Sequence, residues 1–175
     1  MITAKQKSIL SMFDYELFEN TEPVGALGWP DFAEAKNARL KNPFPDVLSK
    51  NIEIYYREQK YIVAFEYLTR DWTKDIRFTL ENEEGILAVA DVVKSKKFAQ
   101  RFEINIAQPF LGRLEPKNGF MQKRYEVIAD KGMLGTIAEK SAVMVKRELV
   151  VDLPVSVSMP VQIFLLFLVC NHAYR

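Results

Sequence analysis

One apolar run near the C-terminus limits what this chain can fold into. The ten residues Val161–Cys170 are apolar except for Gln162. A helix that is apolar on every side must be surrounded by protein or lipid. Pro154 interrupts the run upstream and Asn171 ends it, so it is shorter than the roughly 20 residues of a membrane span. We therefore predict a helix over residues 160–172 that is enclosed by the rest of the chain.

The composition is that of an ordinary globular protein. The chain has 175 residues, which suits a single domain over residues 1–175. Its 24 Lys and Arg balance 23 Asp and Glu, so the net charge of +1 predicts no nucleic-acid partner. A single cysteine excludes an intrachain disulfide framework and a multi-thiolate metal site. The N-terminus lacks a secretory signal, so we expect a cytoplasmic protein, with peripheral attachment to a membrane left open.

The chain from residue 52 onward has the pattern of successive β-strands. Apolar Phe102, Ile104 and Ile106 alternate with more polar neighbours, the period of a strand with one buried face. Further runs rich in Val, Ile, Tyr and Phe are Ile52–Tyr56, Tyr61–Tyr67, Ile76–Leu80, Ile86–Val93, Tyr125–Ala129 and Val143–Val151. Asn and Asp followed by Gly mark turns between them.

The first fifty residues differ from the rest. They contain several Pro and Gly residues and a short predicted helix that begins at Pro30. We interpret residues 1–50 as an N-terminal clasp and not as a domain. Short strands over Tyr15–Phe18 and Val24–Leu27 remain possible additions to the sheet.

These elements predict a mainly β fold, a closed antiparallel barrel around the hydrophobic C-terminal helix. Closure removes exposed strand edges. A helix of about 13 residues is roughly 20 Å long, which matches strands of about six residues. A barrel that holds a helix needs about ten or more strands. The segment from Arg77 also echoes the segment from Arg124, which suggests two related halves.

Two segments carry a resemblance to a known family. Tyr125–Ile137 has Asp130, Gly132 and Gly135 at a turn and its return strand, and Val151–Pro154 has the order hydrophobic, Asp, hydrophobic, Pro before the apolar helix. Together with the order of elements, they resemble the tubby C-terminal-like superfamily, most of all the phospholipid scramblase and LURP-one-related branch. The resemblance implies about twelve strands around the helix, and a lipid-associated or regulatory module that is not an enzyme and needs no cofactor.

The chain also departs from scramblases. The segment before the terminal helix has Glu148 and Asp152 but no cluster of oxygen ligands, whereas calcium takes about 6–8 oxygens. The cysteine cluster that scramblases offer for palmitoylation is absent, and so is their Pro-rich N-terminal tail. We therefore predict no metal site, and no arrangement of residues indicates a catalytic site.

The candidate site is basic. Lys94, Lys96, Lys97 and Arg101 lie within eight residues, and Lys123-Arg124 and Lys146-Arg147 are further pairs. Clustered cations bind anionic lipid at about 1 kcal/mol each, so we predict that the first cluster binds lipid phosphate. The alternative is that these are solvated strand ends that protect sheet edges.

Three functions follow as hypotheses. The first is a non-enzymatic barrel module that binds anionic membrane phospholipid head groups. The second is a soluble protein-interaction or regulatory scaffold with an unknown protein partner and no lipid affinity. The third, in which the apolar run leaves the barrel and enters a bilayer, conflicts with the length of the run. We interpret Cys170 as a small core hydrophobe and His172 as a helix-end hydrogen-bonding residue.

Overall fold

The computed structural model describes residues 1–7, 14–28, 52–68, 75–95, 102–118, 123–140 and 146–173, the side chains of Asn118, His172 and Ala173 excepted. Twelve strands and one helix follow one another in this part of the chain. They are β1 (Ile2–Gln6), β2 (Tyr15–Glu19), β3 (Glu22–Gly28), β4 (Ile52–Tyr56), β5 (Gln59–Tyr67), β6 (Ile76–Asn82), β7 (Gly85–Lys94), β8 (Phe102–Gln108), β9 (Gly112–Asn118), β10 (Lys123–Ala129), β11 (Gly132–Glu139), β12 (Glu148–Asp152) and α2 (Met159–Ala173).

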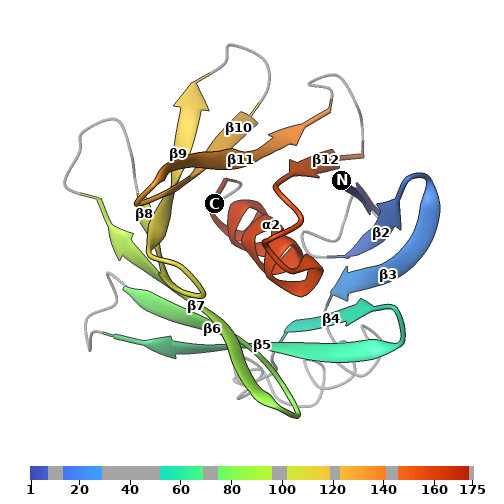
Figure 1. Cartoon of the computed structure of the whole chain (residues 1–175), viewed down its shortest axis with the longest axis horizontal. Coiled ribbons are helices and arrows are strands. Elements are labelled where there is room, and N and C mark those ends of the chain that lie inside the picture. The colour runs from blue at the N-terminus through green and yellow to red at the C-terminus, as the bar shows by residue number, and fades with distance from the viewer. Residues whose placement is uncertain are drawn as a thin grey trace, which may run out of the picture.

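The strands form a closed antiparallel barrel, which confirms the predicted fold class (Figure 1). Each strand pairs with its neighbours in sequence, and β1 pairs with β12 to close the ring, with Ile2 opposite Val151. Two hydrogen bonds of Gln6 extend this closure: its backbone amide donates to the Arg147 carbonyl at 2.9 Å, and the Arg147 amide donates to its side-chain Oε1 at 3.1 Å. No edge strand remains in such a sheet.

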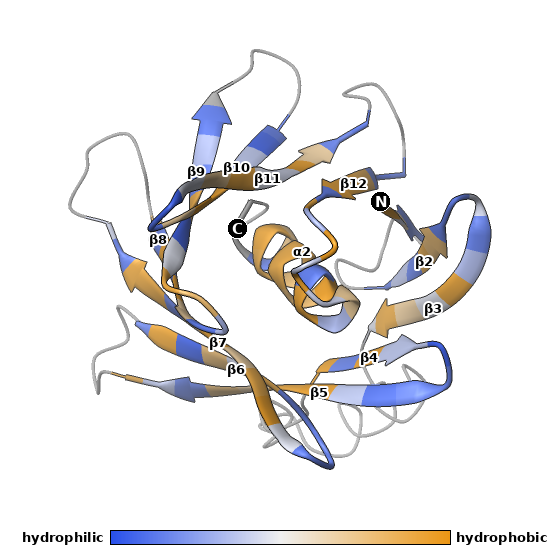
Figure 2. Cartoon of the chain, in the orientation of Figure 1, coloured by the Kyte–Doolittle hydropathy of each residue, from blue (hydrophilic) through white to orange (hydrophobic). Residues whose placement is uncertain are grey.

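The helix α2 lies along the inside of the barrel (Figure 1). Its side chains from Pro160 to Asn171 are all buried, and Figure 2 shows it as an almost wholly hydrophobic element within a wall of alternating character. The Phe167 ring meets Phe78 of β6 edge to face, with centroids 5.4 Å apart. Buried Gln162 donates from Nε2 to the Val157 carbonyl at 2.8 Å. The predicted enclosed helix is therefore confirmed.

No helix in the described ranges is both long enough and apolar enough to cross a membrane.

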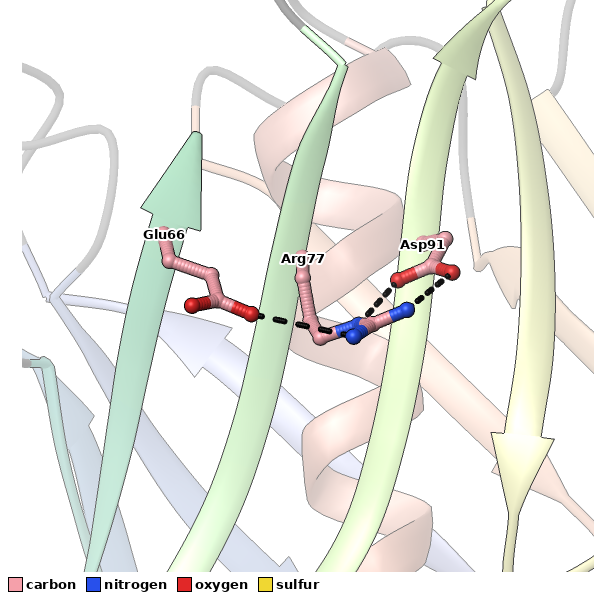
Figure 3. A network of polar contacts seen from close by, with 3 residues as sticks. All are labelled: Glu66, Arg77 and Asp91. Carbon is pink, nitrogen blue, oxygen red and sulfur yellow. Dashed lines mark hydrogen bonds and ion pairs between the residues drawn. The ribbon is translucent and has the colours of Figure 1, made fainter. Parts of the chain in front are cut away.

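The strands alternate between an apolar inner face and a charged outer face. In β6, Ile76, Phe78 and Leu80 are buried against the interior, whereas Arg77 points outward. Arg77 binds Asp91 of β7 through two nitrogens, Nε to Oδ1 at 2.8 Å and Nη2 to Oδ2 at 3.0 Å (Figure 3). Its Nη1 lies 3.7 Å from Glu66 of β5. The outer wall here is a row of matched charges.

The two ends of the barrel differ in how the strands are joined. Short turns at residues 20–21, 57–58, 83–84, 109–111 and 130–131 all lie at the end where α2 begins, which we call the turn end. The other six connections join strands at the end where α2 finishes, which we call the connection end; they are residues 7–14, 29–51, 68–75, 95–101, 119–122 and 140–147.

Three hairpins repeat one design. The pairs β2–β3, β6–β7 and β10–β11 each contain a register shift, at Leu17/Phe18, Leu80/Glu81 and Val127/Ile128. These pairs are four strands apart, so the unit spans a third of the twelve-stranded circuit. The echo between the segments from Arg77 and Arg124 corresponds to two of these hairpins. The recurring hairpin therefore divides the barrel into three parts, whereas the two similar sequence segments predict two halves.

The sequence predictions for the N-terminal region and one strand need adjustment. Residues 2–28 of the predicted clasp contribute β1, β2 and β3 to the wall, and the short predicted helix after Pro30 lies outside the described residues. The last strand begins at Glu148, later than the predicted start at Val143, and residues 141–145 are not described. Strand β9 was not predicted.

Candidate anion-binding end

Lys94 is the member of the predicted basic cluster that the structure describes. It ends β7 with an exposed side chain, while its backbone amide donates to Asp75 Oδ1 at 2.9 Å and so ties this end of β7 to the start of β6. Lys96, Lys97 and Arg101 lie outside the described residues, in the connection between β7 and β8. Lys94 therefore places the start of the cluster at the connection end of the barrel.

Two further basic positions share this end. Arg124 lies at the start of β10, and Lys146 lies just before β12; both are exposed. Lys94, Arg124 and Lys146 thus mark a sector from β7 to β12. Neighbouring strands are about 4.8 Å apart, so five intervals span about 24 Å. One described member of each basic pair or cluster is therefore brought to one rim, although the three are distant in the sequence.

The three cations differ from those on the wall because they are unpaired. Among the described residues, Lys94, Arg124 and Lys146 have no ion-pair partner. Most cations on the barrel wall and at the turns are matched by carboxylates; the pairs are Arg57–Glu19, Lys60–Glu53, Arg77–Asp91, Arg113–Glu115 and Lys117–Glu126. Unmatched exposed cations are free to attract an anionic partner.

The connecting segments extend this difference to the whole connection end. By sequence, its six connections carry thirteen Lys and Arg against six Asp and Glu, a net charge of +7. The five short turns carry two basic residues against four acidic ones, a net charge of −2. By sequence, the two sets of connections thus differ in net charge by nine, although the whole chain carries only +1.

A buried polar cluster lies inside the connection end. The Tyr15 hydroxyl of β2 is buried near the Cys170 thiol of α2 and the Arg147 side chain, and neither contact has the geometry of a well-formed hydrogen bond. Burial, followed by the Cys170 thiol, raises the pKa of Tyr15 far above its usual range. Burial likewise raises the pKa of Cys170 to about 12, with Tyr15 and Arg147 opposing the shift. The thiol is therefore protonated near neutral pH and is not a nucleophile.

A second set of polar groups adjoins this cluster. Partial desolvation lowers the pKa of the Lys123 ammonium, although most of that side chain is exposed; Glu139 opposes the shift and Arg147 adds to it. Burial, then Glu139 and Cys170, raises the pKa of Tyr125. The Lys123 amide also donates to Glu139 Oε2 at 3.3 Å. These side chains interact with Arg147 and Cys170 at the same end of the barrel.

The exposed cations Lys94, Arg124 and Lys146 are suited to binding an anionic partner by charge. In the described part of the chain, no group of three or more His, Cys, Asp or Glu could hold a metal ion. The prediction for Cys170 as a core side chain is confirmed by its burial. The side chain of His172 is outside the described residues. The basic pairs at 123–124 and 146–147 are visible in the sequence, but only the barrel topology shows that they share an end with Lys94.

No protein-family model, curated protein or solved structure matches this chain.

Proposed function

We propose that this protein is a non-enzymatic barrel module that binds anionic membrane phospholipid head groups through its connection end. The observation that supports this most is the set of three exposed, unpaired cations, Lys94, Arg124 and Lys146, in the described part of that end. The net charge of +7 on the connecting segments acts in the same direction. Lys96, Lys97 and Arg101 belong to the same proposed surface.

The width of the surface favours a membrane over a single small anion. Cations spread across about 24 Å of rim cannot converge on one phosphate, because a charge-assisted hydrogen bond needs about 2.7–2.9 Å between nitrogen and oxygen. A plane of many head groups can meet them all. The resemblance to tubby-like and scramblase-like proteins agrees with this partner, and the proposal includes peripheral attachment to the membrane.

Co-sedimentation with vesicles tests the proposal. The protein is mixed with neutral vesicles and with vesicles containing phosphatidylserine, at low and moderate salt, with and without calcium. We expect binding to the anionic vesicles only, weakened by salt because the attraction is screened over about 8–10 Å. The triple variant Lys94→Ala/Arg124→Ala/Lys146→Ala should bind about 100-fold more weakly, at about 1 kcal/mol for each cation.

Lys131 provides the matched control. It is an exposed lysine without an ion-pair partner among the described residues, but it lies at the turn end. Lys131→Ala changes the net charge without touching the proposed surface, so it should leave vesicle binding nearly unchanged. Because it removes one charge, it is compared with Lys94→Ala alone; equal losses in these two single variants would point to total charge instead of the connection end. No binding under any condition would favour the alternative of a scaffold without lipid affinity.

A further inference from the structure

Several large apolar side chains are exposed to solvent at the turn end. The structure contains eight exposed large hydrophobic side chains within its described residues, and six lie at this end, where Tyr55, near the end of β4, is set apart from the other five. We call these five the apolar rim: Met1, Ile86, Leu111, Met133 and Val155. Their exposed fractions run from 53% for Ile86 to 92% for Val155. Side chains gathered in this way, and not scattered singly, mark an interaction surface.

The rim occupies one side of the turn end. Met1 precedes β1, Val155 follows β12, and Met133 lies at the start of β11. Leu111 lies between β8 and β9, and Ile86 lies at the start of β7. Because the spatial order runs β1-β12-β11-β10-β9-β8-β7, these five positions lie within the arc from β1 to β7, with no member on β10.

Acidic groups accompany this arc. Glu83 and Glu84 form the turn beside Ile86, and Asp130 lies in the turn beside Met133; all three are exposed, and the neighbouring Lys131 offsets one of their charges. An anionic membrane would be repelled by these carboxylates. The complementary surface is therefore a protein surface that combines basic and apolar side chains.

The chain itself carries such a surface at its opposite end. The connection end has the unpaired cations Lys94, Arg124 and Lys146, and it also exposes Tyr67 and Leu68. We infer that the apolar rim binds the connection end of a second copy of this chain, so that molecules associate head to tail. Such a contact uses two different patches and leaves one of each free, so it extends into open chains instead of stopping at a dimer.

This inference does not rest on the proposed lipid function. Its test is sedimentation of the full chain over a wide range of protein concentration, at about 20 mM and about 500 mM salt, where screening differs strongly. We expect the average mass to rise past the dimer with concentration at low salt and to return to the monomer at high salt. A chain that stays monomeric up to about 1 mM at low salt, far above the concentrations at which specific complexes form, would overturn the inference.

Variants identify the surface. Val155→Asp and Met133→Asp should each weaken association at least about tenfold, because each places a charge in the apolar contact. Asn105→Asp adds the same charge to an exposed position on the wall and should have no effect. Thermal melting checks that each variant is folded, and Glu83→Lys, at an exposed turn position, replaces Met133→Asp if that variant is not. Association that is indifferent to these changes at the turn end would rule out this surface.

Complementation separates head-to-tail association from a symmetric dimer. One variant, Val155→Asp/Met133→Asp, has a blocked apolar rim; another, Lys94→Glu/Arg124→Glu/Lys146→Glu, has a blocked connection end. Each should be monomeric alone, whereas an equal mixture should form dimers and nothing larger, because each molecule keeps one intact patch. A mixture that remains monomeric, while the unmodified chain associates, would contradict a contact between opposite ends.

Discussion

The Tyr15 hydroxyl is the least satisfied polar group in the connection end. Its side chain is 0% exposed and the hydroxyl has no well-formed hydrogen bond among the described residues. A buried hydroxyl without a partner costs about 1–3 kcal/mol. We expect Tyr15→Phe to leave the free energy of unfolding unchanged or to raise it by about 1 kcal/mol, as measured by urea denaturation. A loss of more than about 1 kcal/mol would mean that Cys170 or Arg147 stabilises the hydroxyl.

The same cluster predicts a dependence on alkaline pH. The pKa of Cys170 is raised from about 9 to about 12 in the folded protein, so above pH 9 the unfolded chain loses this proton while the folded protein keeps it. The unfolded state is thereby favoured. The contribution of Cys170 to the free energy of unfolding should be constant below about pH 9. Between pH 9 and 12 the free energy of unfolding should fall by up to about 1.4 kcal/mol for each pH unit.

Urea denaturation at several pH values measures this slope. Cys170→Ala removes the thiol, so its stability should fall less steeply with pH than that of the unmodified protein, whatever its stability at pH 7. Tyr15→Phe should reduce the slope as well, because burial also raises the pKa of the Tyr15 hydroxyl. Parallel curves for all three proteins would show that neither group contributes.

We expect a charged substitution at the centre of α2 to have the largest effect of any single substitution on stability. Leu166 is 0% exposed inside the barrel, and an unpaired charge there costs several kcal/mol. We expect Leu166→Asp to abolish the cooperative thermal transition. Val155→Asp, three residues after the end of β12 and 92% exposed, should melt as the unmodified protein does. An unchanged melting temperature for Leu166→Asp would refute the enclosed position of the helix.

At the scale of elements, close approach of strands requires glycine at two equivalent positions. A Cβ atom at Gly135 of β11 would overlap the carbonyl oxygen of Asp152, and one at Gly25 of β3 would overlap that of Tyr55. Both lie opposite the register shifts of their hairpins. Ala88 is the corresponding residue of β7, where the neighbouring pair β7–β8 has a shift of its own beside it.

We therefore expect Gly135→Ala to destabilise the barrel by about 1–3 kcal/mol, the usual cost of forcing extra atoms into a packed site. Gly85 is a suitable comparison, because a Cβ there meets nothing and only its φ of +134° opposes substitution. Both variants can be compared by urea denaturation. A Gly135→Ala protein as stable as the parent would show that β11 and β12 can separate without cost.

The elements that the sequence predicted well are those with one strong pattern. Period-two alternation identified β6 and β8, and continuous hydrophobicity identified α2. Strand β9 was not predicted because it contains Pro116, which donates no backbone hydrogen bond, among charged residues. Strand β1 escaped because it turns small Ala4 and polar Gln6 inward. These two strands are recognised by their pairing with neighbouring strands and not by the pattern of their own residues.

The candidate site was predicted in its residue types but not in its extent. Charge clusters are visible in any sequence, so Lys94 and the pairs that include Arg124 and Lys146 could be identified as basic. Whether they meet depends on the order of twelve strands, which no local pattern contains. The apolar rim was missed for the same reason, because Val155 and Met133 are ordinary residues until the topology places them at one end.

On the scale of the whole molecule, the two proposals share one surface and must compete. Anionic vesicles and the apolar rim of a second copy both bind the connection end. We expect phosphatidylserine vesicles to dissociate the head-to-tail chains, which is detected as a loss of energy transfer between differently labelled molecules. Neutral vesicles should have no such effect. The Val155→Asp/Met133→Asp variant should still bind vesicles. Chains that persist on saturated vesicles would show that the two partners use separate surfaces.

The way the barrel closes also determines how the chain must reach its native state. Ile2 pairs with Val151, and only residues 153–158 separate β12 from α2. The ring therefore closes around the helix by joining the two strands that are farthest apart in the sequence, and these long-range contacts make folding slow, on the order of milliseconds to seconds. Before closure, the chain exposes two open strand edges and a wholly apolar helix, so its risk of aggregation is concentrated in the time before the native state forms.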